Sequence, residues 1–456
     1  MGKISKDTRI AVPPRAQAII RTITEAGHEA YAVGGCVRDC ILGRQPQDWD
    51  ITTSARPEQV KALFPHTIDT GLQHGTVTVM MDREGFEVTT YRIDGSYEDS
   101  RHPSRVTFTP SLTEDLKRRD LTINAMAYNE SRGLVDPFGG LEDLERGIVR
   151  CVGNPMERFS EDALRILRAI RFSAQLGYGI EEETLGAVRK LSPTLERISA
   201  ERIQAELIKL LLSPHPDYLR IAYDNGVTKV ILPEFDHAME TDQTHRHHCC
   251  SVGEHTLRSL LHVEADRVLR LAMLLHDLGK PAVLTVDEGG ITHFHGHAAV
   301  SAVMAERILK RLKFDNDTVQ KVCRLVLYHD YGNGMDVDMR MARRAVNRIG
   351  EEAFPGIFAV KYADIMAQSD YCHREKLERL EKWRELYGEI LAGRQCVSLK
   401  TLAVKGSDLI ALGWKPGKEL GAVLQKLLEL VLDDPGRNTR EILLAQAEQM
   451  KIAGES

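Results

Sequence analysis

The sequence predicts an α+β fold in which a small, largely antiparallel sheet lies in the first 140 residues and helices form the rest. Residues 76–81 and 86–92 are rich in β-branched residues and flank an Asp-Arg-Glu-Gly turn, a pattern typical of a hairpin. From about residue 155 onward, apolar residues recur instead at helical spacing. The chain therefore changes from mixed α/β to all-α structure near that point.

The N-terminal elements follow from local patterns. Residues 16–29 are predicted to form a helix, and residues 30–33 a short buried strand that enters a Gly34-Gly35 turn. The helical sequence VRDCILG comes next, followed by a strand around residues 49–51. The hairpin then completes the mixed sheet.

The helical part begins with RFSEDALRILRAIRFSAQLG, in which Ser160 is the predicted N-cap and Gly177 the end. Glu161 and Asp162 would occupy its first turn. Later helical segments are expected at 181–235, 255–280, 297–313 and 317–329, with an amphipathic helix and a small helical unit from about 375. We expect four domains, with the boundaries 1–145, 146–240, 241–375 and 376–456.

Composition is that of a soluble globular protein of several domains. The 456 residues are 43% hydrophobic and 28% charged, and the formal net charge is −6. This charge argues against indiscriminate nucleic-acid binding but is compatible with a local basic face. No apolar run approaches the roughly 18 residues needed to span a bilayer. The polar N-terminus and the absence of any CxxC pair lead us to expect a cytoplasmic, reduced protein.

Asp48 and Asp50 form the first candidate site. Residues two apart on a strand share a face, so both carboxylates would point the same way and could hold Mg²⁺ on the phosphates of a nucleotide. Gly34 and Gly35 upstream would let the backbone approach a triphosphate, and Arg38 could contact phosphate directly. Alone, Asp-x-Asp is more often a loop or a cap.

GGCVRD and QDWDITTSA together resemble the signature of class II nucleotidyltransferases of the polymerase-β superfamily, which include tRNA CCA-adding enzymes and bacterial poly(A) polymerases. The resemblance extends in order and spacing over residues 31–178, through LKRRDLTINAMAYN and RFSEDALRILRAIRFSAQLGY, and continues more faintly to the end. It implies a polymerase-β-like catalytic head followed by helical neck, HD and tail domains. The head would use Mg²⁺.

The resemblance also implies individual roles. Asp48 and Asp50 match the catalytic, metal-binding carboxylates. The nucleotide-binding positions are Gly35 and Arg38 at the phosphates, Arg119, Asp120 and Asn124 at the ribose, Asp162 and Arg165 at the base edge, and Arg168 and Arg171 at further phosphates. The segment Arg101–Arg105 matches a mobile loop that helps to switch from CTP to ATP.

Asp162 and Arg165 are three residues apart, so on a helix they would lie side by side and offer acceptors next to donors. Such a pair can complement a base edge, whereas the ordinary alternative is a surface ion pair. Glu87, on the second hairpin strand, is a third carboxylate near the metals or else a solvated strand residue.

LRLAMLLHDLGKP suggests a second site, because an adjacent His276-Asp277 pair in an apolar helix needs a partner such as a metal. With His255 upstream and Asp364 downstream it resembles the H…HD…D pattern of HD-domain metal-dependent phosphohydrolases. His297 and His329 resemble that family's auxiliary histidines. The resemblance implies a divalent metal here. His245, His247 and His248 fall outside the pattern and are expected in a solvated loop.

The resulting hypothesis is an enzyme that adds C, C and A to the tRNA 3′ end from CTP and ATP, without a template, and releases pyrophosphate. Within the same class, an A-adding enzyme or a poly(A) polymerase stays open. From another class, the HD site could be the main activity, hydrolysing 2′,3′-cyclic phosphates or nucleotides. A tRNA-binding protein without activity is disfavoured because every carboxylate of the signature is present. The expected partners are tRNA, CTP and ATP, with no membrane; the sequence leaves the oligomeric state open.

Overall fold

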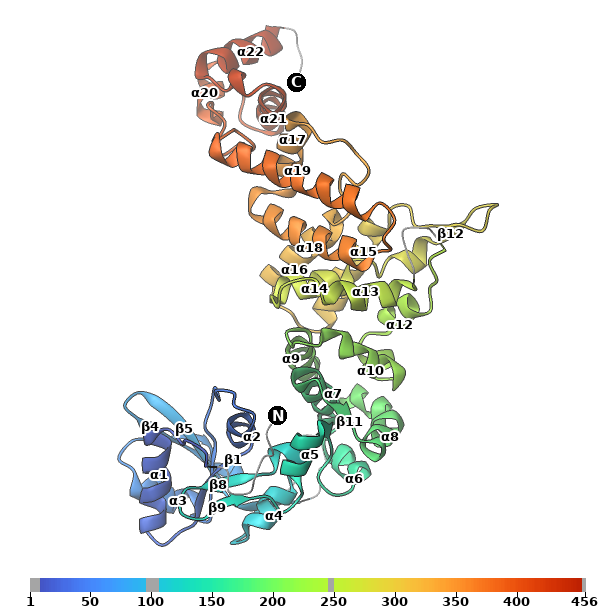
Figure 1. Ribbon diagram of the computed structural model, residues 1–456. Coiled ribbons are helices and arrows are strands. Elements are labelled where there is room, and N and C mark those ends of the chain that lie inside the picture. Colours follow the sequence, from blue (N-terminus) through green and yellow to red (C-terminus); the bar gives the residue numbers. More distant parts are fainter. Residues whose placement is uncertain (1–8, 96–105, 245–249, 453–456) are drawn as a thin grey trace. The chain divides into compact units, whose positions relative to one another are not determined.

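The computed structural model describes residues 9–95, 106–244 and 250–452 (Figure 1). The chain forms two compact units, Met1–Asp236 and His237–Ser456. Unit 1 contains a seven-stranded sheet followed by helices, and unit 2 is almost entirely helical. This arrangement confirms the α+β fold with its sheet in the N-terminal part.

The sheet of unit 1 has the order β3-β4-β5-β2-β1-β8-β9. β2 pairs in parallel with β5, and every other pairing is antiparallel, so the sheet is mixed as predicted. Its strands are β1 (Ala30–Val33), β2 (Ile51–Thr53), β3 (Thr67–Gly71), β4 (Thr76–Met81), β5 (Glu84–Thr90), β8 (Ala127–Asn129) and β9 (Gly133–Val135). β6 (Arg92–Asp94) and β7 (Val106–Phe108) form a separate ribbon.

The predicted hairpin is present as β4 and β5. Its turn is the two-residue step Asp82-Arg83, and both residues adopt positive φ, 50° and 81°, as a tight turn between twisted strands requires. Val77 faces Val88 across the pair, and both are buried. The alternation of buried and exposed residues gives the sheet one covered face, against which α1 (Pro14–Glu25) and α3 (Pro57–Leu63) pack (Figure 1).

Two local predictions are wrong in detail. β2 begins at Ile51, so Asp48 and Asp50 precede the strand; only the Asp50 backbone continues the ladder, accepting a hydrogen bond from Val33 N at 2.9 Å. The predicted helix starting at Ser160 is two helices, α6 (Pro155–Glu161) and α7 (Leu164–Leu176). Asp162 Oδ1, rather than Ser160, accepts the hydrogen bond of a first-turn amide, and this side-chain cap restarts the helix.

Helices complete unit 1. α2 follows β1 directly, and α9 packs along α7. The other helices of this unit are α2 (Gly35–Ile41), α4 (Leu112–Lys117), α5 (Gly140–Arg146), α8 (Glu182–Leu191), α9 (Ala200–Leu211), α10 (Leu219–Asp224), α11 (Thr228–Ile231) and α12 (Pro233–Met239), which continues into unit 2. A two-stranded parallel pair, β10 (Ile148–Val149) with β11 (Gly179–Ile180), connects the segment before α6 with the segment after α7.

In unit 2, the predicted helix 255–280 is divided because Asp266 accepts hydrogen bonds from the amides of Val268 and Leu269 and so caps a new helix. The helices are α13 (Val252–Leu260), α14 (Arg267–Leu275), α15 (His297–Arg311), α16 (Asn316–Tyr328), α17 (Met339–Ile349), α18 (Phe354–Ala367), α19 (His373–Ala392), α20 (Gly406–Ala411), α21 (Lys418–Asp433) and α22 (Arg440–Ile452). β12 (Thr285–Val286) and β13 (Thr292–His293) form a short hairpin.

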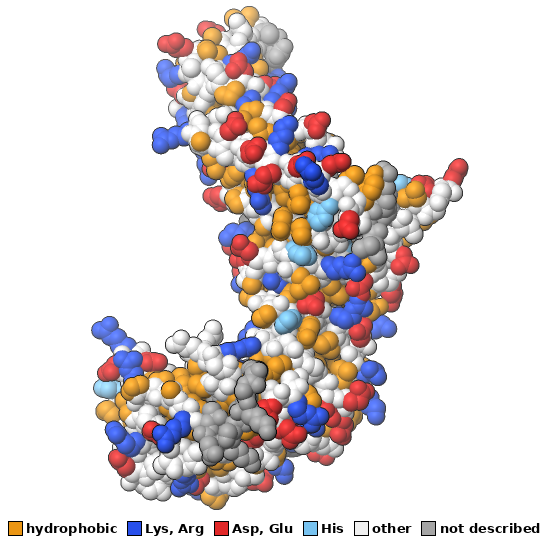
Figure 2. Space-filling model, in the orientation of Figure 1, with side chains coloured by type: hydrophobic (Ala, Val, Ile, Leu, Met, Phe, Trp, Pro, Cys, Tyr) orange, Lys and Arg blue, Asp and Glu red, His pale blue; other side chains and the backbone are white. Residues whose placement is uncertain are grey.

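Charged side chains of both signs are interspersed over the face visible in Figure 2. Among the helices that the structure describes, none is both long and apolar enough to cross a bilayer. The predicted switching loop Arg101–Arg105 and the residues His245, His247 and His248 lie outside the described residues.

Candidate active site and metal cluster

A cleft of about 660 Å³ in unit 1 brings the predicted transferase residues together. Of that set, all except Asp162 and Arg165 line it: Gly35, Arg38, Asp48, Asp50, Arg119, Asp120, Asn124, Arg168 and Arg171. They come from the turn after β1, the segment before β2, the 3-10 turn near Asn124 and α7. The cleft thus contains both carboxylates and arginines, as binding of a metal-associated polyphosphate requires.

The carboxylates of Asp48 and Asp50 line the cleft, and that of a third residue, Glu87, is close enough to interact with them. Asp50 keeps surface open to the cleft, yet neighbouring protein atoms displace enough water to raise its pKa, while Arg119 opposes the rise and Asp48 adds to it. The pKa of Glu87 is likewise raised, by loss of water and then by Asp50 and Asp48. Glu87 is therefore within electrostatic range of the two aspartates, although it does not line the cleft. The two aspartates offer hard oxygen ligands whose mutual repulsion a divalent cation would relieve.

Gly34 allows this arrangement. Its φ is 85°, and a Cβ built there would lie 2.9 Å from Arg119 Nη1. Only glycine takes this conformation without strain, and the guanidinium of Arg119 uses the space. Burial lowers the pKa of Arg119, opposed by Asp115 and then Asp50. The neighbouring Cys36 is excluded as a nucleophile because burial raises the pKa of its thiol to about 12.

The residues predicted to bind the ribose and the phosphates form one hydrogen-bonded chain. Arg38 Nη1 donates to Asn124 Oδ1 at 2.6 Å, Asn124 Nδ2 donates to Asp120 Oδ1 at 3.4 Å, and Arg168 Nε donates to Asp120 Oδ2 at 2.6 Å. Burial raises the pKa of Asp120, but the ion pair with Arg168 outweighs burial and holds the pKa well below its usual range. These side chains are oriented before any ligand binds.

Phe172 and Glu206 are two residues of this site that the sequence analysis did not single out. The guanidinium carbons of Arg38, Arg168 and Arg171 lie 4.8, 5.6 and 3.5 Å from the centroid of the Phe172 ring, within cation–π range. Arg171 Nε also donates to the buried carboxylate of Glu206 at 2.8 Å. In the sequence of α9, Glu206 is a carboxylate on the face that is otherwise apolar, and this was the signal that could have revealed it.

Asp162 and Arg165 lie at the junction of α6 and α7, and their side chains contact different residues. Arg165 Nη1 donates to Glu161 Oε2 at 2.6 Å, and its Nη2 donates to the carbonyl oxygen of Arg118 at 3.2 Å. Asp162 Oδ2 accepts from Arg202 Nη2 at 2.7 Å. Each side chain therefore has an ion-pair partner of its own, Glu161 for Arg165 and Arg202 for Asp162.

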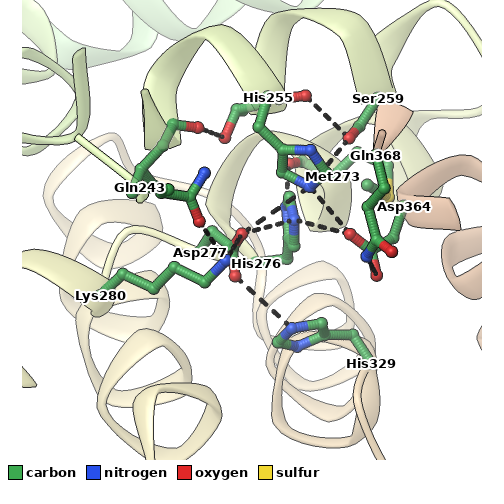
Figure 3. A network of polar contacts seen from close by, with 12 residues as sticks. Gln243, His255, Ser259, Met273, His276, Asp277, Lys280, His329, Asp364 and Gln368 are labelled. Atoms are coloured by element: carbon green, nitrogen blue, oxygen red, sulfur yellow. Dashed lines mark hydrogen bonds and ion pairs between the residues drawn. The ribbon is translucent and has the colours of Figure 1, made fainter. Parts of the chain in front are cut away.

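A second constellation lies in unit 2, where the predicted HD residues converge from α13, the end of α14, α15, α16 and α18 (Figure 3). Two groups could each hold a metal ion, and both contain Asp277. The first also includes His255 and His276, and the second His297 and His329. Asp364 Oδ1 lies 2.8 Å from His255 Nε2. All six predicted residues are therefore in one place.

The histidine tautomers favour a cation. Nδ1 of His276, His297 and His329 lies 2.7–2.9 Å from a backbone carbonyl oxygen, which can only accept, so each Nδ1 carries the proton. The Nε2 atoms are then lone-pair acceptors. Nε2 of His297 and Nε2 of His329 nevertheless lie only 3.2 Å apart. Two facing lone pairs repel each other unless a proton or a metal ion lies between them.

Asp277 is the centre of the cluster. It is 1% exposed, and Lys280 Nζ lies 2.7 Å from its Oδ2. Burial raises its pKa, but His276 and Lys280 outweigh burial, and the pKa of Asp277 lies well below its usual range. Neither carboxylate oxygen has a hydrogen bond of proper geometry with the described residues, despite these close charges. The ligand set therefore fits a divalent metal.

Comparisons with known proteins agree with this organisation. Three family models match the chain: the poly(A) polymerase head domain over residues 30–150, the RNA- and SrmB-binding site of polymerase A over 177–239, and tRNA nucleotidyltransferase domain 2 over 284–447.

Among curated proteins, the CCA-adding enzyme of Limosilactobacillus reuteri is 34% identical over 443 residues, which is 96% of this chain and 97% of the relative. That of Enterococcus faecalis is 35% identical over 447 residues, with the same coverage. The solved structure of the Bacillus stearothermophilus CCA-adding enzyme in complex with CTP is 30% identical, with a TM-score of 0.73 over 98% of this chain and 99% of that one. On this full-length similarity, the chain belongs to the family of CCA-adding enzymes.

Proposed function

We propose that the chain transfers nucleotides from CTP and ATP to the 3′ end of tRNA, adding C, C and A in turn and releasing pyrophosphate at each step. The observation that carries this proposal is the cleft of unit 1, which Asp48 and Asp50 line together with Arg38 and Arg168. Full-length similarity to CCA-adding enzymes, one of them solved with CTP, supports the substrates. We further propose that the chain works in the cytoplasm, where tRNA, CTP and ATP are present.

Asp48 and Asp50 would hold the divalent metal of the transferase site, and the hardness of their carboxylate oxygens favours Mg²⁺. When bound, the ion activates the 3′-hydroxyl and stabilises charge on the leaving pyrophosphate. Arg38, Arg168 and Arg171 bind and orient the triphosphate, because guanidinium groups pair bidentately with phosphate.

The remaining predicted residues select the nucleotide. Asp120 and Asn124 are buried next to the arginines, and we assign them to the ribose 2′-hydroxyl. Asp162, just before α7, offers acceptors, and Arg165, one helical turn before Arg168, offers donors; we assign them to the Watson–Crick edge of the base. Because protein side chains read the base, no template strand is needed.

The double variant Asp48→Ala/Asp50→Ala tests the transfer site. We expect it to retain its fold, since both side chains are solvent-exposed, and to lose incorporation of labelled CMP and AMP into tRNA. Incorporation at the wild-type rate would refute the site. An Asp162→Ala/Arg165→Ala variant should instead keep incorporation while losing discrimination between CTP, ATP and UTP.

We also propose a second function, hydrolysis of a phosphate ester at the metal cluster of unit 2. The observation that favours it is the pair of opposed Nε2 atoms of His297 and His329 beside Asp277, which suits a bound divalent ion. His255, His276, Asp277 and Asp364 would hold one ion, and a bound ion supplies Lewis acidity toward a phosphoryl oxygen. Lys280 adds a positive charge next to the cluster.

Hydrolysis of bis(4-nitrophenyl) phosphate in the presence of Mn²⁺ tests this second function. We expect activity in the wild-type chain and in the Asp48→Ala/Asp50→Ala variant, but none in an Asp277→Asn variant. Absence of activity in all three would refute it while leaving the transferase proposal intact.

A further inference from the structure

A second cavity lies in unit 2 beside the metal cluster, and neither proposed function accounts for it. Its volume is about 300 Å³, and α18, α19 and the loop around Asn333 form its walls. Asn333, Asp364 and Gln368 line both this cavity and the cavity that contains the cluster. The two spaces therefore adjoin, and one ligand can occupy both.

Cationic side chains form part of the wall. Lys361 is already engaged, because its Nζ donates to two backbone carbonyl oxygens and, at 2.6 Å, to Asn333 Oδ1. Arg379 differs: it is half-buried in the wall and makes no hydrogen bond or ion pair with any residue that the structure describes. A guanidinium held in a partly desolvated cavity without a partner suits an anionic ligand.

A hydrogen-bonded chain links this wall to the metal cluster. Lys376 Nζ donates to Gln368 Oε1 at 2.7 Å, and Gln368 Nε2 donates to Asp364 Oδ2 at 3.0 Å (Figure 3 shows Gln368 beside Asp364). Asp364 in turn contacts His255 of the cluster. Lys376 and Arg379 are three residues apart on α19, so they lie on one face of that helix.

The rest of the wall is apolar. Ile365, Leu380 and Trp383 line it. The Tyr331–Gly334 loop closes against Trp383, because a Cβ at Gly332, whose φ is 74°, would come within 2.7 Å of the indole ring. An apolar, partly aromatic wall favours a flat organic group, such as a nucleobase, over inorganic phosphate.

We infer that this cavity binds the nucleoside part of a nucleotide that carries two phosphates, one directed to the metal cluster and the other to Lys376 and Arg379. Three neighbouring features support this class of ligand: the metal cluster suits one phosphate, the adjoining apolar wall suits the base, and the unpartnered guanidinium of Arg379 suits the second phosphate. Phosphates on both sides of a sugar occur in nucleoside bisphosphates and at the end of an RNA chain. The inference rests on the hydrolase proposal for the position of the first phosphate.

Titration calorimetry of the full-length chain with adenosine 3′,5′-bisphosphate and Mn²⁺ tests the inference. Losing a charge-assisted contact costs about 1.5–3 kcal/mol, so we expect Arg379→Ala to raise the Kd by roughly tenfold to a hundredfold. Arg379→Lys should recover part of the affinity. Arg374→Ala is the matched control, because Arg374 lies on the same helix but is exposed and paired with Glu378; we expect its Kd to stay within about twofold.

Two further ligands identify the class, and a separate measurement isolates the hydrolase proposal. Adenosine 5′-monophosphate should bind more weakly than the bisphosphate, and the Arg379→Ala variant should bind both with similar affinity. An equal Kd for wild type and Arg379→Ala would overturn the inference. Equilibrium dialysis with Mn²⁺ in the Asp48→Ala/Asp50→Ala background reports the cluster without the transferase site: if this variant binds the same amount of Mn²⁺ with and without Asp277→Asn, the hydrolase proposal fails, whatever the Arg379 variants show.

Discussion

The ion pair between Arg171 and Glu206 offers a sharp test of how unit 1 orients its arginines. The two side chains are 7% and 5% exposed, and Arg171 Nε lies 2.8 Å from Glu206 Oε2. Replacing Glu206 with glutamine keeps the shape and removes the charge, so Arg171 stays buried without its counter-ion. Breaking a buried pair from one side costs about 3–5 kcal/mol. We expect Glu206→Gln to lower the free energy of unfolding by an amount of this order. Lys209 also contacts Glu206, and any relaxation of Lys209 in the variant would reduce the loss.

Urea unfolding followed by the fluorescence of Trp49 measures this loss. Trp49 is the only tryptophan of unit 1, so a Trp383→Phe/Trp414→Phe background makes the signal specific for that unit. Glu142→Gln is the matched control, because Glu142 pairs with Arg146 on an exposed helix face. Exposed pairs contribute about 0–1 kcal/mol.

The double variant Glu206→Gln/Arg171→Gln completes the experiment. Removing both charges leaves no unpaired ion, so we expect it to recover part of the stability lost in Glu206→Gln. If Glu206→Gln costs no more than Glu142→Gln, the pair is not a buried support of the arginine cluster, and the reasoning is refuted.

Three further predictions concern the cleft and the metal cluster. Phe172→Leu should raise the KM for CTP by about fivefold with little change in kcat, since cation–π contacts contribute about 0.5–1 kcal/mol each, whereas Phe172→Tyr should retain the wild-type KM. The pKa of Asp120 in the folded chain is depressed below its ordinary 3.8. The contribution of Asp120 to stability is therefore complete above pH 3.8 and is lost as the pH falls through the folded pKa. In urea unfolding, an Arg168→Gln variant should be less stable at neutral pH, and its stability should depend less on acid pH. Mn²⁺ at a hundred times its Kd should stabilise unit 2 by about 2.7 kcal/mol, which raises its melting temperature by roughly 5–10 °C in calorimetry, and an Asp277→Asn variant should show no such shift.

The fold was largely predictable because its signals are local. The β4–β5 hairpin has alternating β-branched residues and a short turn, and α7 has helical periodicity ending at Gly177, so periodicity alone locates both. Element ends were less predictable. The cap that starts α7 is a side-chain hydrogen bond of Asp162, and the sequence offered Ser160 as an equally good candidate.

The candidate sites were predictable as sets of residues but not as networks. The motifs around Asp48 and His276 identify which side chains meet, since those residue types recur at fixed spacings. The pairing of Asp162 with Arg202 and of Arg165 with Glu161 depends on how α6, α7 and α9 pack, which no local pattern specifies. The apolar cavity beside the metal cluster is likewise formed by segments distant in sequence, as is usual for binding sites.

The most direct test of the central claim is extension of tRNA transcripts that lack three, two or one of the terminal nucleotides, with CTP and ATP supplied separately and the product lengths read on a sequencing gel. We predict that CTP alone adds two residues to the shortest transcript and stops, that ATP adds one residue only to the transcript ending in CC, and that Asp48→Ala/Asp50→Ala adds none. A long A tail, addition of A alone with no use of CTP, or extension that survives in the double variant would contradict the account.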